Sequence, residues 1–229
     1  MSIADNLSQV KREIADNCHR FDRPESAVTL LAVSKTKPLA DLETAYQAGQ
    51  RLFGENYVQE AVEKHQQLAH LPHIEWHFIG PIQSNKSRQI AETMDWVHTI
   101  DRDKIARRLS EQRPAEMAPL NVLVQVNISG ESSKSGVLLE QLDDMVELVQ
   151  SLPNLRLRGL MAIPAPQADE ASQIAVYEPL QQAFLALQTD HPEIDTLSIG
   201  MSGDLAAAIA SGSTMVRVGT AIFGARNYP

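Results

Sequence analysis

The sequence has 229 residues, of which 43% are hydrophobic and 21% are charged, a composition that is typical of globular proteins and ample for a sizeable core. The formal net charge of −9 argues against a broad surface for nucleic acid or anionic membranes, although a local site for a small anion remains compatible with it. Cys18 is the only cysteine, which excludes an intramolecular disulfide and CxxC chemistry.

The first 21 residues predict an amphipathic helix and not a targeting signal, because apolar residues recur at helical spacing. These residues are Ile3, Leu7, Val10, Ile14 and Phe21. No stretch of the sequence approaches the roughly 20 apolar residues that a membrane span needs. We therefore expect a cytoplasmic protein.

From residue 29 onward, short β-rich runs alternate with helical segments. The runs predicted as strands are 29–35, 51–56, 75–80, 96–100, 121–127, 155–163, 196–202 and 215–224. Among the intervening segments, Asp101 is placed to cap one helix and Gly212 to end another. The stretch PAPQAD, residues 164–169, is predicted to be a loop after the sixth strand.

A strand followed by a helix, repeated eight times, predicts parallel strands joined by right-handed crossovers. Eight such units fit a closed (β/α)8 barrel of the TIM type. We therefore expect an α/β protein with one barrel domain over residues 1–229 and an additional N-terminal helix. An open doubly wound sheet is the alternative, but no predicted strand is followed by a GxGxxG motif.

Functional residues of such barrels lie at the C-terminal ends of the strands, and here those ends are polar and rich in glycine. The first strand ends in TLLAVSKTKP, in which Val33 and Lys35 share one face. Burial of a lysine at the mouth of a barrel would lower its pKa, and a neutral amine suits Schiff-base chemistry. The alternative is a lysine whose head group simply reaches solvent.

The last two predicted strands end in segments suited to a phosphate group. In GMSGDLAAAIASG, Ser202 is predicted to cap the helix whose first-turn N–H groups are available to an anion, and Gly219 and Thr220 follow the last strand. Barrel loops after strands seven and eight frequently hold phosphate. Ordinary helix capping is the alternative for each segment taken alone.

Arg217 shares a strand face with Gly219, so we expect it to point into the barrel. A buried guanidinium needs a carboxylate or a ligand acceptor, and Glu55 is one candidate partner. His73 and His77 lie four residues apart, but they are in a strand-like segment, and we predict no metal site. No GxSxG, HExxH or Walker motif is present.

Seven blocks along the chain together resemble the pyridoxal-phosphate homeostasis proteins, a family similar to the barrel domain of alanine racemase and to other fold-type III pyridoxal-phosphate enzymes. The blocks are LLAVSKTKP, FGENYVQE, EWHFIGPIQSNK, VNISGESSKSG, LRGLMAIP, LSIGMSGD and STMVRVGTAIFGAR. The resemblance runs essentially from end to end. It implies a (β/α)8 barrel that binds pyridoxal 5′-phosphate (PLP).

The resemblance assigns six residues to the cofactor. They are Lys35, Asn56, Ser202, Arg217, Gly219 and Thr220. Lys35 would carry PLP as an aldimine, and Asn56 would line the pocket near the ring. For Lys37 we hypothesise that it adjusts the pKa of Lys35 or receives the cofactor in transit. Lys134 lies in a polar loop and is expected to be solvated.

The resemblance also implies that Ser202, Gly219 and Thr220 hold the phosphate, largely through backbone N–H groups, and that Arg217 faces the pyridine nitrogen. An arginine there keeps the ring nitrogen unprotonated and weakens the ring as an electron sink. Racemisation further needs a base on each face of the substrate, and Tyr57 is not convincingly placed as the second one.

Tyr177 is no better placed as a second base. In alanine racemase that base is a tyrosine of a second domain, and the present sequence ends at Pro229. The expected function is therefore PLP homeostasis and delivery to apo-enzymes through transient contacts. We expect the protein to be a monomer, and we assign no residue to catalysis. A PLP-dependent amino-acid racemase, a class I aldolase-like barrel and a binding module for another phosphorylated metabolite are the alternatives.

Overall fold

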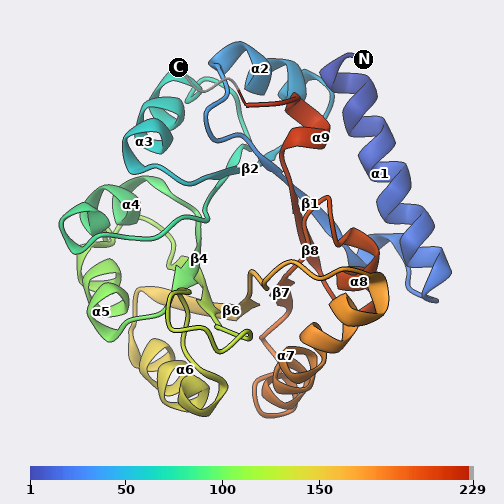
Figure 1. Ribbon diagram of the computed structural model, residues 1–229. Helices are drawn as coiled ribbons and strands as arrows, with labels where there is room; N and C mark the ends of the chain where they lie inside the picture. The colour runs from blue at the N-terminus through green and yellow to red at the C-terminus, as the bar shows by residue number, and fades with distance from the viewer. Residues whose placement is uncertain (227–229) are drawn as a thin grey trace.

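Eight parallel strands close into a barrel in the computed structural model, which describes residues 1–226 (Figure 1). The strands are β1 (Thr29–Val33), β2 (Leu52–Glu55), β3 (Glu75–Phe78), β4 (Trp96–Ile100), β5 (Leu120–Gln125), β6 (Leu155–Met161), β7 (Thr196–Ser198) and β8 (Met215–Val218). Each strand pairs with the next in the sequence, and β8 pairs with β1. The predicted (β/α)8 barrel is confirmed.

The helices form a ring around the barrel (Figure 1). They are α1 (Ile3–Arg20), α2 (Leu39–Gln47), α3 (Val58–Gln67), α4 (Ser87–Thr93), α5 (Asp103–Gln112), α6 (Leu142–Ser151), α7 (Glu170–Asp190), α8 (Leu205–Ala210) and α9 (Thr220–Phe223), with short 3-10 turns at Glu25–Ala27, Ser84–Lys86 and Leu139–Gln141. Within the described part of the chain, no helix combines the length and the hydropathy required to cross a bilayer.

The predicted N-terminal helix is present as α1, which packs outside the ring against α2, α8 and α9 (Figure 1). Its start is fixed by a capping box, in which Asp5 N donates to Ser2 Oγ at 3.1 Å and Ser2 N donates to the Asp5 carboxylate at 3.3 Å. Its buried face repeats at the predicted helical spacing and consists of Leu7, Val10, Ile14 and Cys18.

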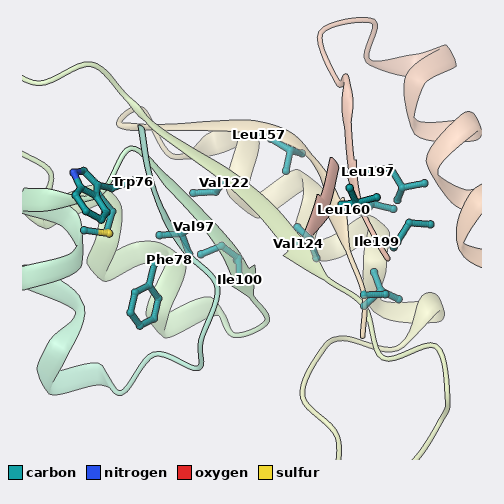
Figure 2. Packing of buried hydrophobic residues seen from close by; sticks show 14 of the residues in the cluster. Trp76, Phe78, Val97, Ile100, Val122, Val124, Leu157, Leu160, Leu197 and Ile199 are labelled. Carbon is teal, nitrogen blue, oxygen red and sulfur yellow. The ribbon is translucent and has the colours of Figure 1, made fainter. Parts of the chain in front are cut away.

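Side chains alternate between two layers along each strand. On β1, Leu30 and Ala32 join the main core between barrel and helices, whereas Leu31 packs with Val33 in a small cluster inside the barrel. Figure 2 shows part of the main core, with labelled residues Trp76, Phe78, Val97, Ile100, Val122, Val124, Leu157, Leu160, Leu197 and Ile199. Inward positions near the carboxyl ends of the strands therefore face the barrel mouth.

The first six predicted strands agree with the structure within two residues at each end. The prediction for the last strand, 215–224, is wrong beyond Val218, because Thr220–Phe223 forms the single helical turn α9. The carbonyl of Gly219 accepts hydrogen bonds from the N–H groups of Ile222 and Phe223, both at 3.0 Å. The β-branched and aromatic residues of this segment favoured a strand, and the local turn overrides that propensity.

Two predicted helix caps are also wrong. α5 begins at Asp103, with Arg102 at the N-cap, and the carboxylate of Asp101 instead accepts a hydrogen bond from Gly136 N at 3.2 Å. α8 begins at Leu205 with Asp204 at the N-cap.

Ser202, predicted to cap α8, lies exposed in the preceding turn. The prediction for the end of this helix is confirmed, because Gly212 follows the C-cap with φ of 90°, a conformation that favours glycine.

Candidate functional site

Lys35 and Asn56 stand at the carboxyl ends of two neighbouring strands. Val33 on β1 pairs with Gly54 on β2, so that Lys35 and Asn56 each follow two residues after the same rung. Lys35 is half-buried in the turn that leaves the strand. The side-chain oxygen of Asn56 is buried and has no hydrogen-bond partner among the described residues. An unpartnered amide at the barrel mouth indicates a position where a ligand donor would be stabilised.

The main chain around Lys35 is held by a buried polar network. The Ser34 hydroxyl donates to Glu55 Oε1 at 2.6 Å. Lys64, on α3, donates to the carbonyl of Ser34 at 2.7 Å, to Glu55 Oε1 at 2.7 Å and to Glu60 Oε1 at 2.6 Å. The N–H of Thr36 also donates to Glu60 Oε1, at 2.6 Å. Both residues that flank Lys35 are thus fixed by Lys64 and its carboxylate partners.

Glu55 does not bind Arg217, and this part of the prediction is wrong. Glu55 is fully buried on the face of β2 that meets α3, where Lys64 reaches it. Burial raises the pKa of Glu55 to about 7, because loss of hydration outweighs the attraction of the Lys64 ammonium group. This carboxyl group therefore belongs to the support of the Lys35 segment.

Arg217 points into the barrel as predicted, but its partners are carbonyl and hydroxyl oxygens. Its Nη1 donates to the carbonyl and to the hydroxyl oxygen of Ser198, both at 2.7 Å, and its Nη2 donates to the carbonyl of Ala162 at 3.0 Å. These bonds use three of the five N–H donors of a guanidinium. Burial lowers the pKa of Arg217, but arginine remains a cation in proteins.

A cavity of about 210 Å³ opens beside Arg217, between the β6–α7 loop and the turn before α8. The carboxylate of Asp204 lies on its wall and accepts hydrogen bonds from the Tyr177 hydroxyl at 2.5 Å and from Met201 N at 2.7 Å. Burial, followed by the charge of Asp204, raises the pKa of Tyr177. The Tyr177 hydroxyl therefore donates to Asp204 and is a poor base. Tyr57 is 54% exposed, so its hydroxyl group is not held in a buried site.

The glycine after β8 lies directly against the end of β1. A Cβ atom on Gly219 would lie 3.2 Å from the carbonyl oxygen of Val33, so this close approach favours glycine. Thr220 begins α9, and N–H groups in the first turn of a helix have no intrahelical acceptor. Gly219 and Thr220 thus adjoin the Lys35 segment. No hydrogen bond joins Ser202 to either of them among the described residues.

Lys37 binds main-chain carbonyls of the segment after α9. Its ammonium group donates to the carbonyls of Gly224 at 3.1 Å and of Ala225 at 2.8 Å, which ties the β1–α2 loop to the segment after α9. Lys134 lies in the loop after β5, where its carbonyl accepts from the Asn127 side chain at 3.2 Å. Residues 1–226 contain no cluster of three or more His, Cys, Asp or Glu side chains suited to a metal ion.

Sequence reasoning missed the residues that support Lys35 and Arg217. Lys64 gave one usable signal, because it falls at helical spacing between Ala61 of α3 and the C-cap residue Leu68, both of which are apolar and buried. A lysine on such a face needs a carboxylate partner. Ser198 gave no comparable signal, since a serine inside a short strand is compatible with many environments.

Comparisons with known proteins identify the family. The family described as alanine racemase, N-terminal domain matches residues 9–227. Over 228 residues the chain is 59% identical to a pyridoxal phosphate homeostasis protein of Escherichia coli (strain K12), with 99% of this chain and 97% of the relative covered. Over 230 residues it is 58% identical to the protein of that name from Vibrio alginolyticus, with 99% of each covered.

Solved structures show the same relationship. PipY of Synechococcus elongatus, solved with PLP bound, is 35% identical with a TM-score of 0.83, and 97% of this chain and 100% of that one are covered. Alanine racemase of Corynebacterium glutamicum shares the fold, with 18% identity, a TM-score of 0.69, and 99% and 61% of the two chains covered. The chain therefore belongs to the alanine racemase N-terminal domain family and, within it, to the pyridoxal phosphate homeostasis proteins.

Proposed function

We propose that this protein binds PLP covalently but reversibly through Lys35, and that it serves in PLP homeostasis and delivery without robust catalysis. The names of its relatives and the PLP bound to PipY support this function. The observation that carries it is that Lys35 follows β1 and that Arg217 lies on β8, the strand that pairs with β1. Arg217 pairs in register with Leu31, which precedes Lys35 by four residues, so Arg217 lies deeper in the barrel than Lys35.

The residues at the mouth fit this cofactor. When bound, PLP supplies an aldehyde that condenses with a primary amine and an electron-withdrawing pyridine ring. Lys35 would hold the aldehyde carbon, the unpartnered oxygen of Asn56 lies on the adjacent strand end, and the remaining donors of Arg217 suit the ring nitrogen. Because arginine is always protonated, such a contact would keep that nitrogen an acceptor and weaken the ring as an electron sink.

The phosphate would lie at the ends of β7 and β8. Ser202, Gly219 and Thr220 would hold it, largely through backbone N–H groups of the turns that begin α8 and α9. The contact between Gly219 and Val33 supports this placement, because it sets the start of α9 beside the Lys35 segment.

The absence of robust turnover is part of the proposal. A racemase needs a second base, and the Tyr177 hydroxyl is committed to Asp204 while Tyr57 is exposed at the N-cap of α3. We expect incubation with common L-amino acids to give racemisation or transamination slower than about 1 per second. A faster reaction would overturn this part of the proposal and would favour the amino-acid racemase.

We further propose a cytoplasmic monomer with one PLP-binding domain over residues 1–229 that contacts apo-enzymes transiently. Cys18 is buried as a free thiol, which suits a reducing compartment. Of the large exposed apolar side chains on the described surface, Ile163 and Met201 line the cavity beside Arg217, and Met1, Tyr57 and Leu185 lie in three different parts of the chain, which does not suggest an extensive permanent interface.

The visible absorbance spectrum of the purified protein with added PLP tests the central claim. We expect a yellow band that borohydride removes, that Lys35→Ala lacks, and that the exposed-lysine control Lys104→Ala retains. A wild-type protein that stays colourless with PLP would overturn the proposal and would favour the aldolase-like barrel. A band that persists in Lys35→Ala would move the covalent link to another lysine.

A further inference from the structure

A continuous chain of hydrogen-bonded side chains crosses the barrel interior below the proposed cofactor site. Arg217 Nη1 lies 2.7 Å from Ser198 Oγ, which lies 3.0 Å from His98 Nδ1. His98 Nε2 lies 2.8 Å from His77 Nδ1, and His77 Nε2 lies 2.9 Å from Glu75 Oε1. Five side chains from four strands thus form one line.

The line runs from the barrel mouth to its opposite end. Arg217 reaches the cavity at the mouth, whereas Glu75 is the first residue of β3, and its side chain is 38% exposed. The three residues between them, Ser198, His98 and His77, are fully buried. His77 also stacks on the Trp96 ring, with 5.1 Å between ring centroids and an interplanar angle of 13°, which restrains its imidazole.

The two ends of the chain dictate the direction of every bond in it. A guanidinium only donates, and an ionised carboxylate only accepts. The hydrogen bond from His77 is the main reason why the pKa of Glu75 is lowered, so Glu75 is the accepting end at neutral pH. With neutral imidazoles, one arrangement satisfies all four bonds: Ser198 donates to His98 Nδ1, His98 Nε2–H donates to His77, and His77 Nε2–H donates to Glu75.

An added proton would break this arrangement. Doubly protonated His98 would donate to Ser198 Oγ, and the hydroxyl hydrogen of Ser198 would lose its acceptor. Burial lowers the pKa of both histidines, and well below the usual value for His98, which also faces His77 and Arg217. The nearby carboxylates of Glu75 and Asp95 oppose the shift for His77, and Arg158, which donates to Asp195 and lies over Trp96, adds to it.

We infer that Ser198, His98 and His77 are positioning residues that fix the orientation of the Arg217 guanidinium at the ring end of the cofactor site. His98 takes the hydroxyl hydrogen of Ser198, which orients a lone pair of Ser198 Oγ toward Arg217, and His98 is held in turn by His77 and Glu75. The remaining Arg217 donors are thereby directed before any ligand arrives. This inference rests on the proposed function for the identity of the ligand, but the hydrogen-bond chain itself does not.

The first experiment needs no cofactor. Nitrogen-15 NMR of the imidazole groups in histidine-labelled protein reports the tautomer of each ring, and His77→Gln and His98→Gln assign the signals. We expect both rings to be neutral Nε2–H tautomers between pH 6 and pH 8, and Ser198→Ala to shift the Nδ1 signal of His98. A protonated ring or an Nδ1–H tautomer at either position would overturn the inference, whether or not PLP binds.

The second experiment measures the dissociation constant of PLP by absorbance. We expect Ser198→Ala to weaken binding about tenfold, as for loss of one hydrogen bond to a charged group, and Ser198→Thr to restore most of it. The matched control is Ser213→Ala, because Ser213 is equally buried but donates to the carbonyls of Ile199 and Met215 outside the chain. Thermal unfolding of each variant separates lost stability from lost positioning.

The outcomes are distinguishable. If wild-type protein fails to bind PLP while NMR finds the expected tautomers, the proposed function fails and the hydrogen-bond chain stands. If PLP binds and Ser198→Ala binds it as tightly as wild-type protein or Ser213→Ala does, positioning by the chain is overturned. Should Ser198→Ala not fold, His77→Gln tests the same claim from the far end, with a threefold to tenfold weaker affinity expected.

Discussion

The two sides of the barrel mouth are built in opposite ways. Next to β1, the barrel interior contains an apolar cluster that consists of Leu31, Val33, Leu52, Ile79 and Met215. On the other side, the interior carries the hydrogen-bonded chain from Arg217 through Ser198, His98 and His77, beside the apolar side chains of Trp96, Leu123 and Met161. Lys35 is therefore supported from outside the barrel, through Lys64 on α3, and Arg217 is supported from inside.

The difference matches what each residue is proposed to do. The network of Lys64 acts on the main chain of Ser34 and Thr36, so it sets where Lys35 leaves the strand. The interior chain acts on the guanidinium of Arg217 itself and fixes its direction. A lysine that forms and releases a covalent bond must move at its tip, whereas a fixed donor works best when it is already oriented.

Removing Lys64 has the largest expected effect. Lys64→Met removes the donor to the Ser34 carbonyl, Glu55 and Glu60, and we expect a loss of about 3 kcal/mol in the free energy of unfolding at neutral pH. Urea unfolding measures it. The double variant Lys64→Met/Glu55→Gln should recover part of the loss, and Lys104→Met, at an exposed site of α5, should change little. Equal stability of Lys64→Met and wild-type protein would show that the outer support is dispensable.

The matching change on the inner side is His98→Phe. It keeps a ring of similar size but leaves the hydroxyl hydrogen of Ser198 without an acceptor and His77 Nδ1 without a donor, so we expect a loss of about 2 kcal/mol. Urea unfolding at neutral pH measures this loss as well. Because Met215 belongs to the apolar cluster and not to the hydrogen-bonded chain, Met215→Leu should cost less than His98→Phe. A larger loss for Met215→Leu would contradict the greater weight given to the hydrogen-bonded chain.

The architecture could be predicted from the sequence because it depends on local patterns. Alternating apolar strands and capped helices predicted the barrel, and the position of Lys35 at the end of β1 followed from the strand period. Thr220–Phe223 was missed because its composition favours a strand, whereas Gly219 and its neighbours form a turn. Ser202 and Asp204 are both good capping residues two positions apart, and only the contacts of Asp204 with Tyr177 and Met201 distinguish them.

The supports of the site could not be predicted, because they join distant elements. Glu55 and Arg217 both lie near strand ends and carry opposite charges, which suggested a pair. The structure places Glu55 on the outer layer and Arg217 on the inner one, so the strand itself separates them. The line from His77 to Ser198 joins residues 21 and 100 positions apart in successive steps, and no sequence spacing specifies it.

The raised pKa of Glu55 predicts a smaller effect, on the pH dependence of stability. The folded state holds this proton up to about pH 7, whereas the unfolded value is 4.5. Glu55 therefore stabilises the fold below about pH 4.5, and this contribution is lost as the pH rises through 7. His77 and His98 act in the opposite direction in the same range, because their folded pKa values are lowered.

The difference between Glu55→Gln and wild-type protein removes the contribution of the histidines. We expect the free energy of unfolding of Glu55→Gln, relative to wild-type protein, to rise by about 2 kcal/mol between pH 5 and pH 8. Urea unfolding at each pH measures it. A difference that is constant over this range would mean that Glu55 stays ionised and that the attraction of Lys64 exceeds the cost of burial.

Lys37→Met has the smallest expected effect on stability. It tests how the segment after α9 is held to the β1–α2 loop. Lys37 is half-buried, so loss of its bonds to the Gly224 and Ala225 carbonyls should change the free energy of unfolding by only about 0.5 kcal/mol. Hydrogen exchange of residues 220–226 should nevertheless become several-fold faster, because these bonds hold the segment after α9 to the β1–α2 loop. Lys37→Arg, which keeps a cationic donor, is the control. Unchanged exchange together with altered PLP loading would instead favour the hypothesis that Lys37 acts on Lys35 or on the cofactor, and the segment after α9 would then need another anchor.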